Sequence, residues 1–177
     1  VFFTHHYGCN MAQDFPEIII IDATYKTNSS KLPLVNVLCV SNLGRANLKN
    51  ALVASAFLTN EKKASYTWLA QTLRRVIWPT GRVGIFITDN DAALVNSIEE
   101  IFPESKHILC GWHIYQHLRT NLCNCFLDSD HLEDIGKVLK TMIYKARDEK
   151  SFNDADHRYR SWIGKAAISY PEQECKG

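Results

Sequence analysis

The sequence lacks any long apolar run and any excess of charge of one sign. No apolar segment approaches the roughly 20 residues that a membrane-spanning helix needs, so we expect no membrane partner. The formal net charge is only +1, so any affinity for nucleic acid has to come from local patches. The first residues show no basic segment followed by an apolar core, and we therefore expect no signal peptide.

The cysteines and the overall composition indicate the cellular compartment and whether the chain is folded. The six cysteines are scattered, and Cys39 lies inside an apolar run; this pattern does not indicate a disulfide framework. A reducing compartment, cytosol or nucleus, is therefore expected. Hydrophobic residues make up 46% of the chain and charged residues 22%, which is typical of a folded domain and not of disorder. Because the sequence begins at Val1 without a methionine, we expect an excised piece of a longer protein.

Two acidic residues stand at the ends of apolar segments. Asp22 closes the run 18–21, and Asp89 closes the run 83–88. An ionised group in an apolar setting is costly unless a partner holds it. If the two strands are neighbours, the carboxylates repel each other unless protons or cations lie between them. Oxygen ligands favour Mg²⁺ or Mn²⁺, so the pair predicts a divalent-metal site that acts on phosphates.

The hydrophobic pattern changes its period along the chain. Short apolar segments separated by turns come first, which is typical of an antiparallel meander. Helical spacing then alternates with two more apolar strands, and the sequence after Cys110 has a helical pattern without a clear strand. We expect strands at 18–23, 34–40, 48–58 (partly ambiguous with helix), 83–88 and 106–109, helices at 66–76, 92–101, 112–126, 131–147 and 151–165, and no element in the lead-in 1–17.

This order of elements predicts an α/β fold. A meander followed by right-handed βαβ units is the ribonuclease H-like arrangement, here a mixed five-stranded sheet followed by an all-helical insertion. In it the fourth strand lies beside and parallel to the first, roughly 4.8 Å away. Asp22 and Asp89 would then be close enough to bind one metal ion. The expected domains are a core at 1–113 and a helical insertion at 114–177.

Several short motifs follow one another over about two-thirds of the chain. None is specific alone, whereas their order and spacing together are. They are Phe15-Pro16-Glu17, Ile21 to Asn28, Pro33-Leu34, Ala56-Phe57-Leu58 with Glu61, Tyr66-Thr67-Trp68, Ile87-Thr88-Asp89 with Ala93-Leu94, and Phe102 to His107 running into Cys110 to Ile114.

In this order the motifs resemble the transposase domain of Mutator-like elements (MULE), a family of active transposases and domesticated transcription regulators. The resemblance implies a DDE-type DNA transposase. Such enzymes use three acidic residues and two divalent cations, Mg²⁺ or Mn²⁺, to cut a DNA strand with water and to join the freed 3′ hydroxyl to target DNA. Asp22 and Asp89 match the first two acids, as catalytic metal ligands. Cys110 and His113 match the cysteine–histidine motif of the family.

The sequence departs from the family pattern at the third acid, for which we find no matching residue. In the family it is a glutamate on a helix beyond an all-helical insertion, and 114–177 resembles that insertion. Glu172 and Glu174 lack the expected flanking pattern. We therefore expect the chain to stop before the third acid and to be catalytically incomplete by itself.

Two alternatives concern the metal ligands. The segment 89–91 could be a helix cap, with Asp91 as the ligand in place of Asp89; Asp89 is favoured because it comes first after the strand. Cys110 and His113 could belong to a zinc site, but zinc needs four ligands. The nearby cysteines, at positions 123 and 125, would face different ways on a helix. We therefore expect packing and no structural zinc, and His107 and His117 are interpreted as surface or core histidines.

The remaining expectations concern partners. Lys26 and Lys31 follow Asp22 closely and are the candidates for DNA contact, whereas the basic residues of the helix near 62–75 also suit a solvated face. The resemblance implies transposon ends and target DNA as partners, a nuclear location, and a homodimer or higher oligomer of the full-length protein. The alternative functions are a domesticated, non-catalytic DNA-binding regulator and a ribonuclease H-like nuclease without joining activity.

Overall fold

The structure is a computed structural model that describes residues 1–24, 28–44, 47–125 and 129–169, with side chains for 1–24, 28–44, 47–121 and 133–161. It divides into two compact units, Val1–Cys110 and Gly111–Gly177, and each unit is considered by itself. Within the described residues, none of the helices has the length and apolar character that crossing a membrane requires.

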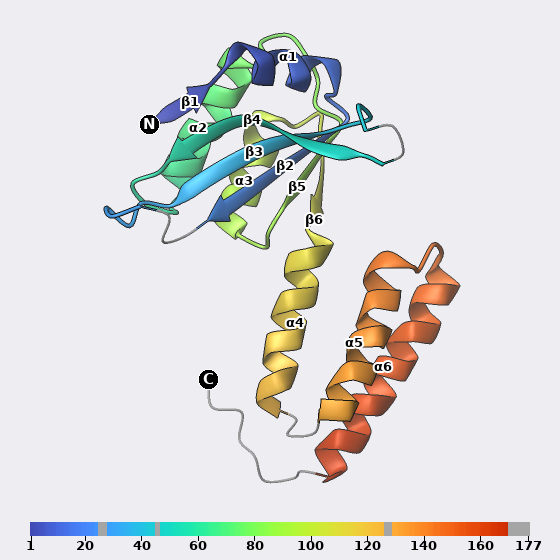
Figure 1. The fold of residues 1–177 in the computed structure, drawn as a ribbon. Coiled ribbons are helices and arrows are strands. Elements are labelled where there is room, and N and C mark those ends of the chain that lie inside the picture. The colour runs from blue at the N-terminus through green and yellow to red at the C-terminus, as the bar shows by residue number, and fades with distance from the viewer. Residues whose placement is uncertain (25–27, 45–46, 126–128, 170–177) are drawn as a thin grey trace. The chain divides into compact units, whose positions relative to one another are not determined.

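The described part of the first unit is built on a six-stranded mixed sheet (Figure 1). The strand order is β1-β4-β3-β2-β5-β6. Strands β2, β3 and β4 form an antiparallel meander, β5 pairs parallel with β2, and β6 pairs parallel with β5. Their bounds are β1 (Phe2–Thr4), β2 (Ile18–Thr24), β3 (Leu34–Ser41), β4 (Lys49–Phe57), β5 (Ile85–Thr88) and β6 (Lys106–Leu109).

The predicted ribonuclease H-like fold is confirmed. The five predicted strands are present as β2 to β6, and the fourth of them, β5, lies beside and parallel to the first, β2. The helix α2 (Lys63–Val76) leads into β5, and α3 (Ala92–Ile101) connects β5 to β6. Each crossover therefore carries a helix, as parallel neighbours require.

The expectation of a lead-in without secondary structure is wrong, because 1–17 contains β1 and the helix α1 (His6–Asp14). With only three residues, β1 is too short to show an alternating pattern. In α1 the sequence signal was obscured by Gly8, which ordinarily weakens a helix. A Cβ at Gly8 would lie 2.6 Å from the carbonyl oxygen of Val53, so glycine here permits close packing of α1 against β4.

The core lies on the sheet face that carries Phe86. The Trp78 ring, which follows α2, lies edge-on to Phe86 with centroids 6.4 Å apart, and Phe102 at the end of α3 lies 4.9 Å from Phe86. Trp78 is 1% exposed, and its indole N–H donates to the carbonyl oxygen of Ala12 at 3.1 Å. The ends of α1, α2 and α3 are therefore joined over this face.

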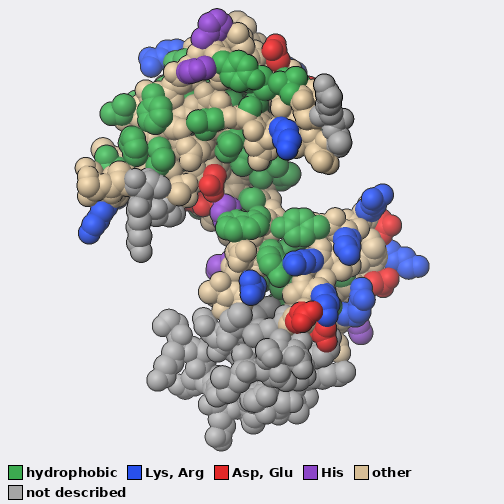
Figure 2. Space-filling model, in the orientation of Figure 1, with side chains coloured by type: hydrophobic (Ala, Val, Ile, Leu, Met, Phe, Trp, Pro, Cys, Tyr) green, Lys and Arg blue, Asp and Glu red, His purple; other side chains and the backbone are tan. Residues whose placement is uncertain are grey.

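The opposite face of the sheet is less buried. Ile20 on β2 and Ile87 on β5 are neighbours there and only partly buried. Leu38 pairs with Leu52 across β3 and β4, and Leu52 is 56% exposed. Figure 2 shows many hydrophobic side chains on the viewed side of the first unit.

The second unit is helical, as the sequence predicts. It contains α4 (Gly111–Cys125), α5 (Ser129–Tyr144) and α6 (Glu149–Ser169), and α5 packs against both α4 and α6. Among its described side chains, the buried hydrophobic ones are Ile135, Leu139 and Ala155. The unit begins at Gly111, three positions before the boundary expected from the sequence.

Candidate functional site

The pairing of β2 with β5 ends two residues before Asp22 and Asp89. Ile20 on β2 is the partner of Ile87 on β5, and two further residues along each chain lead to Asp22 and Asp89. Asp22 belongs to the less buried face of β2. Asp89 directly follows the last residue of β5, the neighbouring strand, which is roughly 4.8 Å away. The structure therefore confirms that the strand with Asp22 and the strand that leads to Asp89 are parallel neighbours.

A polar row continues from Asp22 across the meander. Asp22 is paired with Asn36 on β3, and Asn36 is paired with Ser55 on β4. The Ser55 hydroxyl donates to Asn36 Oδ1 at 2.8 Å, and Ser55 is only 4% exposed. Polar side chains thus cross three adjacent strands, β2, β3 and β4, at the level of Asp22, on a face that is otherwise largely apolar.

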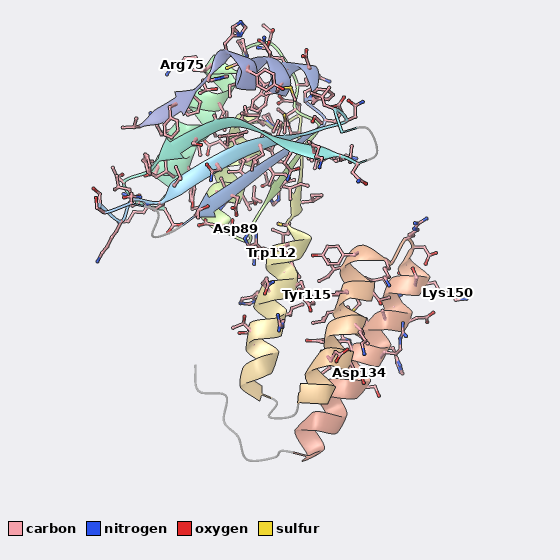
Figure 3. All side chains as sticks on the ribbon, in the orientation of Figure 1. Arg75, Asp89, Trp112, Tyr115, Asp134 and Lys150 are labelled. Atoms are coloured by element: carbon pink, nitrogen blue, oxygen red, sulfur yellow. The ribbon has the colours of Figure 1, made fainter. Side chains whose placement is uncertain are left out.

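The turn after β5 contains both acids that were considered as ligands. Figure 3 shows Asp89 at the end of β5. Asp91 caps α3, because its Oδ1 accepts from the backbone N–H groups of Ala93 at 2.7 Å and Leu94 at 3.1 Å. This cap engages Asp91 in holding the helix, and only Asp89 continues the register opposite Asp22. Asp91 therefore has the helix-cap role that the sequence allowed for.

A buried tyrosine ties the start of α2 to the start of α3. The Tyr66 hydroxyl lies 3.3 Å from Glu61 Oε1 and 3.4 Å from Asp91 Oδ2, and the residue is 1% exposed. Since a phenol has one hydrogen, the two carboxylates share it. The sequence interpretation placed Tyr66 in a helix pattern and in the motif 66–68, and it did not predict these contacts.

A second group of hydrogen bonds surrounds the last residue of β5. Thr88 is 0% exposed, and its hydroxyl donates to the carbonyl oxygen of Asp89 at 2.7 Å. Nε2 of His107, on β6, lies 2.8 Å from the same hydroxyl. The Cys110 backbone N–H donates to the Thr88 carbonyl oxygen at 2.6 Å. Sequence reasoning left His107 as a surface or core histidine and missed this contact.

The two acids fit part of a divalent-cation site. Carboxylate oxygens are the donors that Mg²⁺ and Mn²⁺ prefer, and Mg²⁺ commonly completes its octahedral sphere with water. Among the described residues, no group of three or more His, Cys, Asp or Glu residues is arranged to hold a metal ion. Asp22 and Asp89 therefore supply two acidic donors, which is fewer than the three that the family resemblance implies.

The cysteine–histidine motif falls at the junction of the two units. Cys110 is the last residue of the first unit and is partly buried. His113 lies in the first turn of α4, with its ring 4.8 Å from the Trp112 ring in an edge arrangement. The side chains of residues 123 and 125, and the glutamates at 172 and 174, lie outside the described part of the chain.

One of the two lysine candidates for DNA contact can be located. Lys26 lies outside the described residues. Lys31 is exposed, in the connection that follows β2, and it has a left-handed backbone with φ 54°. The Asn28 side chain holds this connection by bonding the backbone N–H and carbonyl oxygen of Leu32, at 3.1 and 2.7 Å. Lys31 is thus fixed at the end of the sheet that carries the acids.

The basic residues of α2 are largely engaged elsewhere. Lys63 forms an ion pair with Glu100 at 2.9 Å, and Arg74 forms one with Glu104 at 2.7 Å. Figure 3 labels Arg75 at the end of the first unit away from Asp89. These positions suit a solvated helix face more than a DNA contact beside the acids.

The sheet order and the acids at its parallel strands define a ribonuclease H-like domain. The sequence matches the MULE transposase domain over residues 18–117, more than half of its 177 residues, and the chain belongs to this family. The resemblance inferred from the motifs is thereby confirmed, and the chain is related to transposases.

Two relatives and one solved structure illustrate the similarity. The protein FAR1-RELATED SEQUENCE 5 of Arabidopsis thaliana is 31% identical over 119 residues, which are 67% of this chain and 14% of that protein. FAR1-RELATED SEQUENCE 2 of the same plant is 25% identical over 163 residues, 89% of this chain and 18% of that protein. The chain thus spans less than a fifth of either relative. The Mos1 transposase catalytic domain, solved with Raltegravir and Mg, gives a TM-score of 0.34 at 14% identity and 94% coverage of both chains.

Proposed function

We propose that this chain is part of the catalytic domain of a DDE-type DNA transposase, in which Asp22 and Asp89 hold divalent cations. The observation that supports this proposal best is the parallel pairing of β2 with β5, which makes the strand that contains Asp22 and the strand that Asp89 follows direct neighbours. Membership of the MULE family supports the transposase origin. Strand cleavage, strand transfer and DNA as the substrate are part of the proposal.

The proposed roles follow from the positions of the two acids. Bound Mg²⁺ or Mn²⁺ would activate the attacking oxygen and stabilise the leaving oxygen of a phosphodiester. Asp22 is paired with Asn36 on one side, and its other neighbour is the strand that leads to Asp89; we propose that Asp22 would contact both cations and that Asp89 would hold one. Two adjacent carboxylates repel each other in the absence of cations, and this repulsion favours metal binding.

The DNA substrate would lie at the same end of the sheet. Lys31 is exposed there, and we propose that it contacts a backbone phosphate of the transposon end or of the target DNA. We also propose that the full-length protein works in the nucleus as a homodimer or higher oligomer. Light scattering of the full-length protein, with and without transposon-end DNA, would measure that assembly.

Metal binding is the first test, because it does not require the complete enzyme. Mn²⁺ affinity is measured by electron paramagnetic resonance on the wild type and on Asp22→Asn and Asp89→Asn. Each substitution removes an acidic ligand, so we expect affinity to fall by at least about tenfold. The control is Asp14→Asn, an exposed acid at the end of α1, which should bind as the wild type does. Equal affinity in all four proteins contradicts the proposal.

The second test uses the full-length protein and DNA. Manganese-dependent nicking of transposon-end DNA is expected to disappear in Asp22→Asn and in Asp89→Asn. Lys31→Gln should retain nicking but require lower salt, because one phosphate contact is lost. Activity that survives either aspartate substitution removes that residue from the metal site.

A domesticated, non-catalytic DNA-binding regulator is the second candidate function. The FAR1-related relatives favour it, since the family includes proteins that retain the fold without transposition. Such a protein would bind DNA with an affinity that Asp22→Asn does not change, and it would leave the strand uncut. Manganese binding that depends on both aspartates favours the transposase instead.

A further inference from the structure

Thr88 is a polar residue at a position where packing requires no polar group. It is 0% exposed at the end of β5, and by strand alternation it shares the helix-covered face with Phe86. A valine has nearly the same shape and would be buried there without the cost of removing a hydroxyl from water. The hydroxyl is therefore expected to contribute through its hydrogen bonds.

The direction of these hydrogen bonds can be deduced. The carbonyl oxygen of Asp89 can only accept, so the Thr88 hydroxyl hydrogen is used at that 2.7 Å contact. The hydroxyl oxygen is then the acceptor at the 2.8 Å contact with His107 Nε2, and the hydrogen there belongs to the imidazole. The order of donation is from His107 to Thr88 and from Thr88 to the Asp89 backbone.

Thr88 and its hydrogen bonds lie at the point where β5 leaves the sheet. Thr88 is the last residue of β5 and is the partner of Leu109 on β6, whereas Asp89 lies just beyond the strand. On the far side, the Asp91 cap fixes the start of α3. Asp89 is thus bounded by the threonine–histidine pair before it and by the helix cap after it.

We propose that Thr88 and His107 are positioning residues for Asp89, holding the backbone so that its carboxylate stays level with Asp22. This inference rests on the proposed metal-binding role of the two acids. Groups that orient a metal ligand without touching the metal typically affect affinity by about 10–100-fold. Through Thr88 at the end of β5, the pair links the backbone of Asp89 to His107 on β6, a strand that carries neither acid.

Two matched pairs of variants test the link from each side. Thr88→Val keeps the volume and removes the hydroxyl, whereas Thr88→Ser keeps the hydroxyl. His107→Phe removes the ring N–H, whereas His107→Gln offers an amide N–H at a similar reach. Mn²⁺ affinity is measured by electron paramagnetic resonance, and the free energy of unfolding is measured without metal. We expect Thr88→Val and His107→Phe to bind about tenfold more weakly, and the serine and glutamine variants to stay close to the wild type.

The outcomes separate this inference from the proposed function. Wild-type affinity in Thr88→Val or in His107→Phe overturns the positioning role, while loss of binding in Asp22→Asn leaves the proposed function in place. Wild-type affinity in Asp22→Asn and Asp89→Asn overturns the proposed function itself. Equal losses in Thr88→Ser and Thr88→Val, matching their losses of stability, would show a packing role only.

A metal-free measurement checks the bond directly. Long-range ¹H–¹⁵N spectra of the wild type should show the hydrogen on His107 Nε2, and Thr88→Val should shift the backbone amide signals of residues 89 and 90. A histidine with its hydrogen only on Nδ1 contradicts the proposed order of donation. If Thr88→Val does not fold, the His107 variants measure the same link from β6.

Discussion

The two units of the chain secure their structures in different ways. In the first, Trp78 and Phe86 belong to a core to which α1, α2, α3 and strands β2 to β5 contribute. In the second, the buried hydrophobic residues among the described side chains are Ile135, Leu139 and Ala155, and Figure 2 shows positive and negative side chains interspersed on its surface.

This difference shows which unit can hold a precise site. Asp22 and Asp89 are 67 positions apart (89 − 22), and the strands that lead to them, β2 and β5, are paired side by side. In the second unit the helix contacts are between successive helices, α4 with α5 and α5 with α6. A substitution in the core of the first unit should therefore disturb the positions of the acids, whereas a substitution in the second unit should have only a local effect.

The largest expected effect comes from removing the central aromatic side chain of the first unit. Trp78→Ala should lower its free energy of unfolding by about 3–5 kcal/mol, because it creates a cavity and leaves the Ala12 carbonyl oxygen without its donor. Leu139→Ala is the matched change in the second unit. Hydrogen exchange, followed by peptide, should show faster opening of the first unit in Trp78→Ala only. Equal acceleration in both units by either variant would show that they unfold as one.

A smaller effect is expected at a glycine in the first unit. A Cβ at Gly84 would lie 2.7 Å from the carbonyl oxygen of Glu17, just before the paired segments of β2 and β5. Gly84→Ala should cost about 1–3 kcal/mol, because the backbone must move apart. At Gly81 the nearest atom to such a Cβ is 3.5 Å away, on Trp78, so Gly81→Ala is the control. Chemical denaturation measures both, and equal values would contradict the proposed crowding.

Removing a helix cap in each unit should have a smaller effect, and it tests the same difference between the two units. Asp91→Ala removes two backbone hydrogen bonds from the start of α3 and should cost about 1 kcal/mol. Asp148, which accepts from the Ser151 backbone N–H at 2.7 Å, is the exposed counterpart before α6, and Asp148→Ala should affect only the first turn of that helix. Circular dichroism and hydrogen exchange measure the two effects, and loss of structure throughout the second unit in Asp148→Ala would contradict this.

The Asp148 cap should also depend on pH. The Ser151 backbone and side-chain hydrogen bonds lower the pKa of Asp148 below its ordinary value. The carboxylate form is therefore the one that the folded helix favours. Its contribution is present above the ordinary aspartate pKa and is lost as the pH falls through the lowered pKa. Protection of the α6 amides should decline over that acidic range in the wild type and not in Asp148→Ala.

The smallest effect is expected from an exposed ion pair of the second unit. The pKa of Lys137 is raised by hydrogen bonds to Asp134 and Glu133, at 3.1 Å each. Any contribution is present below the ordinary lysine pKa and is lost as the pH rises through the raised pKa. Because solvent and salt screen exposed charges, Lys137→Gln should leave stability at neutral pH unchanged within error. A clear loss would show that surface charge carries more of this unit's stability than its small set of buried residues suggests.

Periodicity and topology were sufficient to predict most of the fold. Apolar strands with few turn residues, such as 34–40, and helices with a clear apolar stripe, such as 92–101, appear close to their predicted bounds. The parallel pairing of β2 with β5 also follows from sequence, because the βαβ handedness leaves few ways to arrange the strands. The cap at Asp91 was recognisable from its place before the apolar stripe of α3.

The parts that sequence reasoning missed depend on contacts between distant residues. Strand β1 exists because Phe2 pairs with Ala56, and three residues carry no periodic signal. The contact between Thr88 and His107 joins two strands, and a threonine or histidine in an apolar run does not reveal its partner. The same holds for Tyr66, whose hydroxyl meets carboxylates from two segments.

The pairing of β1 with β4 has a further consequence for handling the protein. The Val1 nitrogen donates to the Phe57 carbonyl oxygen at 2.9 Å, and the Phe57 N–H returns a bond to Val1 at 2.9 Å. Cutting the polypeptide after Thr4 would leave the N–H and carbonyl groups of β4 open at the sheet margin, close to the exposed Leu52. Open margins of this kind recruit a strand from another molecule. Preparations trimmed by proteases at this point should cloud and precipitate while intact material stays clear.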